Sequence, residues 1–596
     1  MSVATDRDPQ LIWSEAEEPR SGRFGDVYFS AEDGLSETRA VFLEGCGLPD
    51  AWNGRSHFTI AELGFGTGLN IAAVLDLWQR TRTPGQRLSL FSVEGFPLAP
   101  EDARRALSHW PDLALATAAL LSGWPAATPG FHRIDLPGFD ATLDLAVGPV
   151  DWALEQWSGR ADAWFLDGFS PATNPDMWSE TVMDALAARS APDARVATFT
   201  VAGDVRRRLA VRGFTVEKRP GHGRKRQRLE ARRHPSADAQ IRACRTPSRI
   251  AVVGAGIAGA SVARALTSQG QTAMVFDSVG PGHGGSGFPA ALVTPRFDLG
   301  DTAIAGLFAQ ALERAATLYD VIPDAVLDRG VIQQPATDRD IGRFARIADQ
   351  PIWAEGTMVL RDDGTLAMHD AMTVSPPTIL ADWLPDSFLR TRPVSTIDRQ
   401  TGGWVLRDQD GAALAEVDAV ILCAGAGNAT LLPDLALAPV RGQAEWVQQD
   451  GPAATAWGGY VAPTRDGFLF GATHDRGQTT TEVRSEDSAR NLATLATRFP
   501  ERAADIDATT IRSRAAIRAT TRDRLPIAGA VPGQSGLFVL GGLGSRGFCL
   551  APLLAEHVVA LALGRPSPLP ADIARRIDPA RAAVRALVEP PTSKDG

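Results

Sequence analysis

Three glycines with the spacing of a pyrophosphate-binding turn stand near the middle of the chain. Apolar residues from Ile250 to Val253 lead into them, and a helical pattern follows. The three are Gly254, Gly256 and Gly259. In a strand–turn–helix unit this spacing lets the backbone approach a dinucleotide, while the helix N-terminus, here at Ile257, faces the pyrophosphate. Such a turn normally opens a domain, so the sequence predicts that another domain is complete upstream.

A second glycine turn lies in that upstream part, in the segment ELGFGTGLN. It contains Glu62 followed by Gly64, Gly66 and Gly68. This spacing, with an acid just ahead, suits S-adenosylmethionine better than a dinucleotide, because S-adenosylmethionine has no pyrophosphate to bind and needs only close backbone approach. The next apolar run ends in Glu94, where a carboxylate can accept both ribose hydroxyls. Taken alone, Glu94 is equally consistent with a surface acid at a strand end.

An aspartate follows the third apolar run of this first part. The segment AWFL reads as a buried strand, and Asp167 stands directly after it. Open α/β sheets place their sites at the carboxyl ends of strands. We therefore expect Asp167 to lie beside the glycine turn and to take part in catalysis.

A basic segment runs from Arg206 to Arg233. It holds twelve Lys and Arg residues against two Glu, a local charge of +10 that leaves −20 for the rest of the chain, whose net charge is −10. Concentrated positive charge on an acidic protein can attract phosphates at one place. A solvated charged segment remains an equal alternative from composition alone.

Further features of the second glycine-rich half favour FAD over NAD. Asp277 ends a strand 23 residues beyond Gly254, at the spacing of a ribose-binding acid. Ser286 lies in the glycine-rich loop that follows, and Gly425 follows the buried strand VIL. A third glycine turn precedes a long apolar helix, whose N-terminus can stabilise negative charge on a reduced flavin. Its candidate contacts are Gly544, Ser545 and Gly547.

The first half resembles the methyltransferase half of the bifunctional tRNA 5-methylaminomethyl-2-thiouridine biosynthesis family. The motifs ELGFGTGLN, VEGFP, FLDGFSPATNPDMW and GHGRKR carry the resemblance. It implies that the methyl acceptor is a primary amine on a modified wobble uridine of tRNA. An amine of this kind has a pKa of about 10, so the site must orient and deprotonate it, and Asp167 is the expected acceptor or base. The residues expected on the tRNA backbone are Arg206, Arg207, Arg208, Arg224, Lys225 and Arg226.

The second half resembles the D-amino-acid oxidase and glycine oxidase superfamily and the second half of the same tRNA-modifying family. GSGFPAALVTP, PVRGQ, TRDRLPIAG and LGSRGFCLAPLLAE carry this resemblance. It implies that Arg518 and Arg546 hold the substrate carboxylate, a task that the bidentate arginine fork suits. The pattern around both arginines differs from that of glycine oxidase, and a structural ion pair is the alternative for each.

The predicted fold is α/β. A Rossmann-like S-adenosylmethionine methyltransferase domain (residues 1–237) is followed by a linker (238–248) and a FAD-binding Rossmann-type oxidoreductase domain (249–564). The resemblance implies an α+β substrate-binding subdomain inserted at roughly 303–511. Residues 565–596 form a C-terminal tail with a short helix.

Composition limits the remaining classes of function. The N-terminus has no apolar leader, and no apolar run reaches membrane-spanning length. The four cysteines form no CxxC pair, so neither a metal site nor disulfides are expected. We expect a cytoplasmic monomer without metal.

The residues alone indicate a FAD oxidoreductase fused to a methyltransferase, and the resemblance implies a bifunctional tRNA wobble-uridine enzyme with the following two steps. The FAD domain removes the carboxymethyl group of 5-carboxymethylaminomethyl-(2-thio)uridine as glyoxylate, and the S-adenosylmethionine domain methylates the resulting amine. Two alternatives belong to other classes. One is a small-molecule amine or amino-acid oxidase fused to an unrelated methyltransferase, and the other is a non-catalytic tRNA-binding protein that kept the folds.

Overall fold

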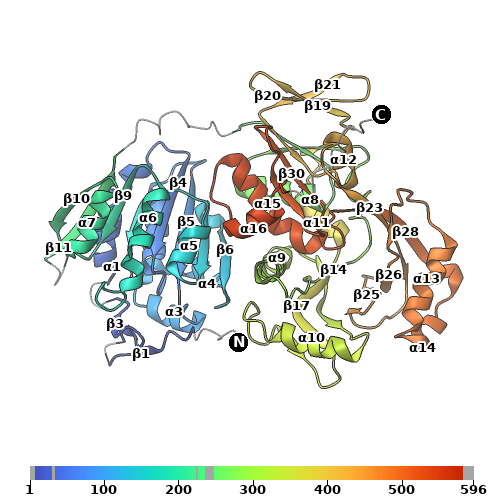
Figure 1. Cartoon of the computed structure of the whole chain (residues 1–596), viewed down its shortest axis with the longest axis horizontal. Helices are drawn as coiled ribbons and strands as arrows, with labels where there is room; N and C mark the ends of the chain where they lie inside the picture. Colours follow the sequence, from blue (N-terminus) through green and yellow to red (C-terminus); the bar gives the residue numbers. More distant parts are fainter. Residues whose placement is uncertain (1–6, 16, 30–33, 223–225, 235–246, 582–596) are drawn as a thin grey trace, which may run out of the picture. The chain divides into compact units, whose positions relative to one another are not determined.

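A computed structural model describes residues 7–15, 17–29, 34–222, 226–234 and 247–581 (Figure 1). Contacts within the chain divide it into two compact units, one built from the residues before the linker and the other mainly from residues 247 onward. Arg224, Lys225, Cys244 and most of the predicted linker lie outside the described residues.

An eight-stranded sheet forms the centre of the first unit, in the order β10-β11-β9-β8-β4-β5-β7-β6. The inner strands β9, β8, β4, β5 and β7 are parallel, and the outer strands are antiparallel to their neighbours. The strands are β4 (His57–Leu63), β5 (Arg87–Glu94), β6 (Gly130–Leu136), β7 (Ala141–Val147), β8 (Ala161–Leu166), β9 (Ser190–Thr198), β10 (Phe214–Pro220) and β11 (Gln227–Arg233). Strand order reverses between β4 and β8, which is where open α/β sheets form their binding crevice.

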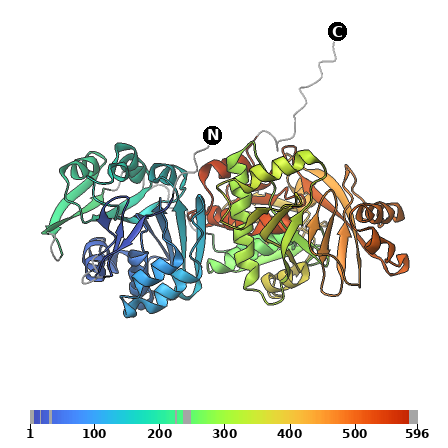
Figure 2. The same ribbon diagram turned by 90° about the horizontal axis from the view of Figure 1, so that it is seen from below.

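Helices cover both faces of this sheet. In Figure 2 the blue helices α2–α4 and the teal helices α5–α7 lie on opposite sides of it. Two apolar cores result, and the central strands read as nearly continuous apolar runs because both of their faces are buried. The helices are α1 (Gly34–Thr38), α2 (Leu69–Thr81), α3 (Pro100–Leu107), α4 (Ala114–Ser122), α5 (Val150–Gln156), α6 (Glu180–Ala188) and α7 (Gly203–Val211).

Short segments complete the first unit. A small N-terminal sheet contains β1 (Leu11–Trp13), β2 (Pro19–Ser21) and β3 (Asp26–Val27). Single helical turns follow at η1 (Arg39–Glu44), η2 (Asp50–Trp52), η3 (Pro111–Leu113), η4 (Pro137–Phe139) and η5 (Pro175–Trp178).

A six-stranded, mostly parallel sheet carries the dinucleotide turn of the second unit. Its order is β18-β13-β12-β22-β30-β29. The strands are β12 (Ile250–Val253), β13 (Ala273–Asp277), β18 (Leu389–Thr391), β22 (Ala419–Leu422), β29 (Ile527–Ala530) and β30 (Leu537–Gly541). The chain between β18 and β22 forms a separate small sheet, which contains β19 (Thr396–Gln400), β20 (Gly403–Arg407) and β21 (Ala413–Val417).

A second large sheet, mainly antiparallel, contains ten strands from two separate stretches of the chain, residues 291–374 and 438–520. They are β14 (Ala291–Val293), β15 (Val326–Gln333), β16 (Met358–Leu360), β17 (Leu366–Val374), β23 (Ala438–Val447), β24 (Thr455–Ala456), β25 (Tyr460–Pro463), β26 (Phe468–Gly471), β27 (Asp475–Arg476) and β28 (Arg512–Thr520). Segments of the dinucleotide-binding sheet alternate with these stretches along the chain. The predicted α/β class with Rossmann-like domains is confirmed, while the predicted domain boundaries stay predictions.

Helices of the second unit alternate with its strands along the chain. They are α8 (Ile257–Ser268), α9 (Thr302–Asp320), α10 (Asp338–Ala348), α11 (Pro376–Trp383), α12 (Asn428–Leu431), α13 (Ser485–Ala496), α14 (Pro500–Ala504), α15 (Gly547–Leu563) and α16 (Ala571–Ile577), with single turns η7 (Gly425–Gly427) and η8 (Ala508–Thr510). Across the described ranges, no helix combines the length and the apolar character needed to cross a membrane.

Candidate functional sites

The first glycine turn lies at the strand-order reversal of the first unit. All three of its glycines have positive φ angles. A Cβ at Gly64 would stand 2.7 Å from the carbonyl oxygen of Asp167, so no side chain fits there. The turn and the end of β8 are therefore in direct backbone contact, and the structure brings together the predicted turn and the predicted catalytic residue.

Asn70, in the first turn of α2, joins two of the predicted acids. Its amide nitrogen donates to Glu62 Oε1 at 3.0 Å and to Asp167 Oδ2 at 2.7 Å. The Thr38 hydroxyl donates to Asn70 Oδ1 at 2.8 Å, which fixes the orientation of the amide. Asn70 belongs to the ELGFGTGLN motif, but no role was predicted for it, and no pattern in the sequence points to Thr38.

Glu62 is fully buried at the end of β4. Burial raises its pKa to about 8, and the nearby charges of Asp167 and Glu94 act in the same direction. The Ser92 hydroxyl donates to Glu62 Oε2 at 2.6 Å. A carboxyl with this pKa stays largely protonated near neutral pH, so Asp167 faces a largely neutral neighbour across the Asn70 amide.

Glu94 accepts hydrogen bonds from the glycine turn itself. Its Oε2 accepts from the Gly66 N–H at 2.8 Å, and its Oε1 accepts from the Phe96 N–H at 2.9 Å. Burial raises the pKa of Glu94. Each carboxylate oxygen keeps a second lone pair, so the carboxylate remains able to accept from a ribose.

Aromatic side chains border this site. The ring of Phe169, two residues after Asp167, lies 5.0 Å from the ring of Phe24 and 5.3 Å from that of Tyr28, centroid to centroid. Trp178 is only 3% exposed and donates from Nε1 to the Phe169 carbonyl at 2.9 Å. Trp178 therefore belongs to the core and supports the loop after Asp167.

The predicted basic segment is more neutral in the structure than in the sequence. Acids outside the segment pair with it: Glu180 pairs with Arg208 and Arg212, Asp193 lies 3.4 Å from Arg232, and Asp204, on the same helix, pairs with Arg207. The local charge of +10 counts only residues of the segment itself, and these partners offset part of it. Arg206 and Arg226 are exposed. The tRNA contacts assigned to this segment stay predictions.

The second glycine turn, in the other unit, is closely packed. A Cβ at Gly254 would lie 2.5 Å from the Cys423 carbonyl oxygen, and a Cβ at Gly259 would lie 1.8 Å from the Gly254 carbonyl oxygen. Near Gly256 the Ser286 hydroxyl accepts from the Ile257 N–H at 3.0 Å. The structure thus brings the predicted loop of Ser286 to the N-terminus of α8, where a pyrophosphate would bind.

Asp277 accepts a hydrogen bond from the backbone of the second glycine turn, as Glu94 does from the first. Its Oδ2 accepts from the Ala255 N–H at 2.8 Å, and its Oδ1 accepts from the N–H groups of Val279 and Gly280. The predicted ribose-binding acid therefore also shapes the dinucleotide turn. Gly425 has a φ of +58° and open space where a Cβ would point, which leaves room for a bound group beside it.

The third glycine turn follows β30, as predicted. Ser545 is exposed, Gly547 is the first residue of α15, and the Gly544 N–H donates to the Ala519 carbonyl at 3.0 Å. This last bond ties the turn that carries Arg546 to β28, the strand that carries Arg518. The Arg546 side chain donates to Thr294 Oγ1, and the Arg518 side chain donates to the Thr473 carbonyl at 3.2 Å.

Tyr319 supports the first turn of α15. Pro552 lies inside this helix and has no N–H to donate to the carbonyl of Phe548, four residues earlier. The hydroxyl of the buried Tyr319, on α9, donates to that carbonyl at 2.7 Å. Burial holds the pKa of Tyr319 well above its usual range, so the hydroxyl keeps the proton that it donates. No pattern in the sequence points to this contact.

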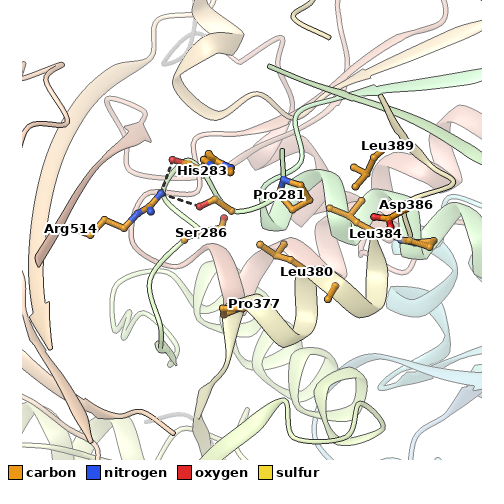
Figure 3. A pocket seen from close by; sticks show the side chains of 13 residues that line it. Pro281, His283, Ser286, Pro377, Leu380, Leu384, Asp386, Leu389 and Arg514 are labelled. Atoms are coloured by element: carbon orange, nitrogen blue, oxygen red, sulfur yellow. Dashed lines mark hydrogen bonds between the residues drawn. The ribbon is translucent and has the colours of Figure 1, made fainter. Parts of the chain in front are cut away.

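A pocket of about 720 Å³ lies beside the loop of Ser286 (Figure 3). The loop forms one wall, and Leu380 and Leu384 form another. The Arg514 side chain, from β28, donates to the carbonyls of His283 at 2.7 Å and Gly282 at 3.0 Å. A Cβ at Gly287 would meet the Arg514 guanidinium at 2.7 Å. Arg514 thus joins the second large sheet to the loop.

These arrangements fit the two expected cofactors by their chemistry. The first site offers carboxyl groups to a cationic sulfonium cofactor and an amine, and its strand-end acid can accept from a ribose. The second site offers a helix N-terminus and arginines to pyrophosphate and carboxylate groups. Within the described residues, no group of three His, Cys, Asp or Glu side chains could hold a metal ion, and Cys46, Cys423 and Cys549 are buried free thiols.

Two protein families match the two halves. The family described as S-adenosyl-L-methionine-dependent methyltransferase matches residues 111–234, and the family described as FAD dependent oxidoreductase matches residues 249–561.

Relatives match nearly the whole chain. A tRNA 5-methylaminomethyl-2-thiouridine biosynthesis bifunctional protein MnmC from Caulobacter sp. is 53% identical and covers 96% of this chain and 98% of its own. A protein of the same name from Maricaulis maris is 41% identical over 94% of this chain and 93% of its own. Among solved structures, a glycine oxidase from Geobacillus kaustophilus is 23% identical, with a TM-score of 0.48, over 54% of this chain and 95% of its own.

Proposed function

We infer that this chain, which belongs to the family of tRNA 5-methylaminomethyl-2-thiouridine biosynthesis bifunctional proteins, modifies the wobble uridine of tRNA in two steps. Its second unit is a FAD-dependent oxidoreductase and its first unit is an S-adenosylmethionine-dependent methyltransferase. The observation that supports this most directly is the junction of Asp167, Asn70 and the first glycine turn in a chain that also carries a complete dinucleotide turn.

The oxidative step would come first. FAD, when bound, would supply the hydride acceptor for the methylene between the amine nitrogen and the carboxylate, and hydrolysis of the resulting imine would give glyoxylate and a primary amine. The arginines Arg518 and Arg546 would hold the carboxylate and so orient this methylene. Ile257, Ser286 and Asp277 arrange the backbone around the pyrophosphate and ribose, and Tyr319 supports the first turn of α15.

The methylation would follow on the amine. Bound S-adenosylmethionine supplies the methyl group. Asp167 accepts a hydrogen bond or a proton from the amine, whose lone pair must be free to attack. Asn70 holds the Asp167 carboxylate in place, and Glu94 accepts from the ribose while bonding to the turn. Because the two activities share one chain, the amine released by the first is held near the second.

The finer points of the proposal follow from this substrate. We propose that the protein acts in the cytoplasm as a monomer that needs no metal. The basic segment is proposed to contact the tRNA backbone through Arg206, Arg207, Arg208 and Arg226, together with Arg224 and Lys225. The rival reading, a small-molecule oxidase fused to an unrelated methyltransferase, is disfavoured by relatives that match both halves at once.

Nucleoside mass spectrometry tests the proposal. The purified protein is incubated with tRNA that carries 5-carboxymethylaminomethyl uridine, with and without S-adenosylmethionine. Loss of the carboxymethyl group without the cofactor and gain of one methyl group with it are expected. Unchanged nucleosides in both samples, from protein that contains FAD, would overturn the tRNA function and favour free amines.

A further inference from the structure

Two strands place arginines on either side of one residue of β23. In the antiparallel register, Val440 of β23 lies opposite Arg476 of β27 and opposite Arg518 of β28. Directly opposed residues point to the same face of a sheet, and neighbouring strands are about 4.8 Å apart. Arg476 and Arg518 therefore share one face, with their backbones about 10 Å apart across two strand spacings.

The acid next to Arg476 is turned away from this face. Asp475 lies opposite Arg441 in the register, and side chains alternate between faces along a strand. On its own face Asp475 accepts from Arg490 at 3.0 Å and lies 3.8 Å from the buried Arg441. The negative charge adjacent in sequence is thus already paired on the other side of the sheet.

A third arginine comes from the turn that follows β28. The Arg524 N–H donates to the Thr521 carbonyl at 3.2 Å, which closes the turn, and the nearest acid in sequence, Asp523, is paired with Arg581 at 2.9 Å. Partial burial lowers the pKa of His474, and the charges of Arg518, Arg476 and Arg524 lower it further, against a smaller opposing contribution from Asp475. His474 thus lies within the positive field of all three arginines.

Within the described part of the chain, two of these arginines keep their charge unpaired. Arg490, by contrast, pairs with Asp475 at 3.0 Å. Arg476 and Arg524 are exposed, and no carboxylate of the described residues forms an ion pair with either. Leaving guanidinium groups unpaired around a partly buried third arginine produces a site that attracts anions.

We propose that Arg476 and Arg524 bind RNA phosphates next to the nucleotide whose carboxylate reaches Arg518. This rests on the proposed function. A free amino acid has one carboxylate and needs one cationic site, whereas a nucleotide within a chain brings further phosphates at a spacing set by its backbone. Arginine forks suit these oxygens, and each phosphate contact adds to the salt dependence of binding. Through Arg476 and Arg524 the oxidoreductase unit thus distinguishes tRNA from free amines. This discrimination does not depend on the basic segment of the first unit.

The test compares two substrates in one reaction, the anaerobic reduction of the flavin. Variant Arg476→Ala/Arg524→Ala is measured against wild type and against Arg361→Ala/Arg502→Ala, which removes two other exposed arginines of the same unit. The substrates are tRNA carrying 5-carboxymethylaminomethyl uridine and the isolated nucleoside, which has no phosphate.

With tRNA, we expect the first variant to need at least tenfold more substrate for half-maximal rate, with little change in the maximal rate. The slope of log affinity against log salt should become less steep by about two, one for each lost phosphate contact. With the nucleoside, all three proteins should agree within twofold. Equal losses in the control variant, an equal loss with the nucleoside, or an unchanged salt slope would overturn the proposal. Wild-type flavin that neither substrate reduces would instead overturn the proposed function.

Discussion

The two glycine turns of this chain are built alike, but the predicted functional side chains of the two sites differ in kind. In each, the acid at the end of the next strand accepts from an N–H of the turn: Glu94 from Gly66, and Asp277 from Ala255. Around the first turn the other functional groups are carboxyls: Asp167, and Glu62, whose raised pKa keeps it largely neutral. Around the second unit's site they are arginines, Arg518 and Arg546. The backbone unit is therefore general, and the charge of the side chains around it selects the reactants.

The physical reason lies in what each site must bind. A sulfonium cofactor and an alkylamine are cations, and carboxyl groups stabilise them. A pyrophosphate and a substrate carboxylate are anions, and helix N-termini and guanidinium groups stabilise those. If this comparison is right, changes in one unit should leave the chemistry of the other intact.

The largest effect is expected from Gly259→Ala. The new Cβ would lie 1.8 Å from the Gly254 carbonyl oxygen, so the dinucleotide turn and α8 cannot keep their packing. The purified variant should contain no FAD by absorbance, while its methyl transfer to an aminomethyl tRNA persists. Gly306→Ala is the control, because α9 has open space there. Normal flavin content in Gly259→Ala would contradict the packing argument.

Asp167→Asn should produce the next largest loss. The amide cannot take a proton from the amine, so the rate of methyl transfer should fall by about a hundredfold to ten-thousandfold. Oxidation by the other unit, followed as glyoxylate release, should not change. Asp176→Asn, in the same loop but exposed, serves as the control. A loss smaller than tenfold would show that the amine is deprotonated elsewhere.

Asn70→Leu tests whether methyl transfer depends on the amide that donates to both Glu62 and Asp167. A hydrogen bond to a charged group contributes about 1.5–3 kcal/mol, so methyl transfer should slow by about tenfold or more. A carboxylate that loses a donor keeps its proton to higher pH, and the acid limb of the rate profile should therefore move to higher pH. The control is Asn174→Leu in the loop after β8. A slower enzyme with an unmoved profile would limit Asn70 to a packing role.

The smallest effect is expected from Tyr319→Phe. It leaves the buried Phe548 carbonyl without the hydroxyl, which should lower the free energy of unfolding by about 1–3 kcal/mol. Pro552→Ala restores an N–H to the helix, so the cost of Tyr319→Phe should shrink in that background. Denaturant melts of the four proteins give the coupling. Equal costs in both backgrounds would show that the hydroxyl does not replace the missing helix bond.

Sequence reasoning predicted the positions of both glycine turns. It did not predict the side-chain hydrogen bonds that connect the two sites to distant parts of the chain. Gly64, Asp167, Gly254 and Asp277 could be found because turn geometry and strand ends leave local patterns. Asn70 was inside a recognised motif, yet its role depends on Thr38 and Asp167, which are distant in the chain. Tyr319 and Arg514 act through single contacts across the fold, which no local pattern records.

The sequence by itself determined the order of the two cofactor-binding units, the fold class and the cofactor types, because these depend on short-range spacing that the backbone imposes. The tertiary structure alone decided which charges remain unpaired. It brings Glu180 and Asp193 to the basic segment and turns Asp475 away from Arg476. Electrostatic pairing depends on distance in space and on the face of a strand, and neither quantity is set by proximity along the chain.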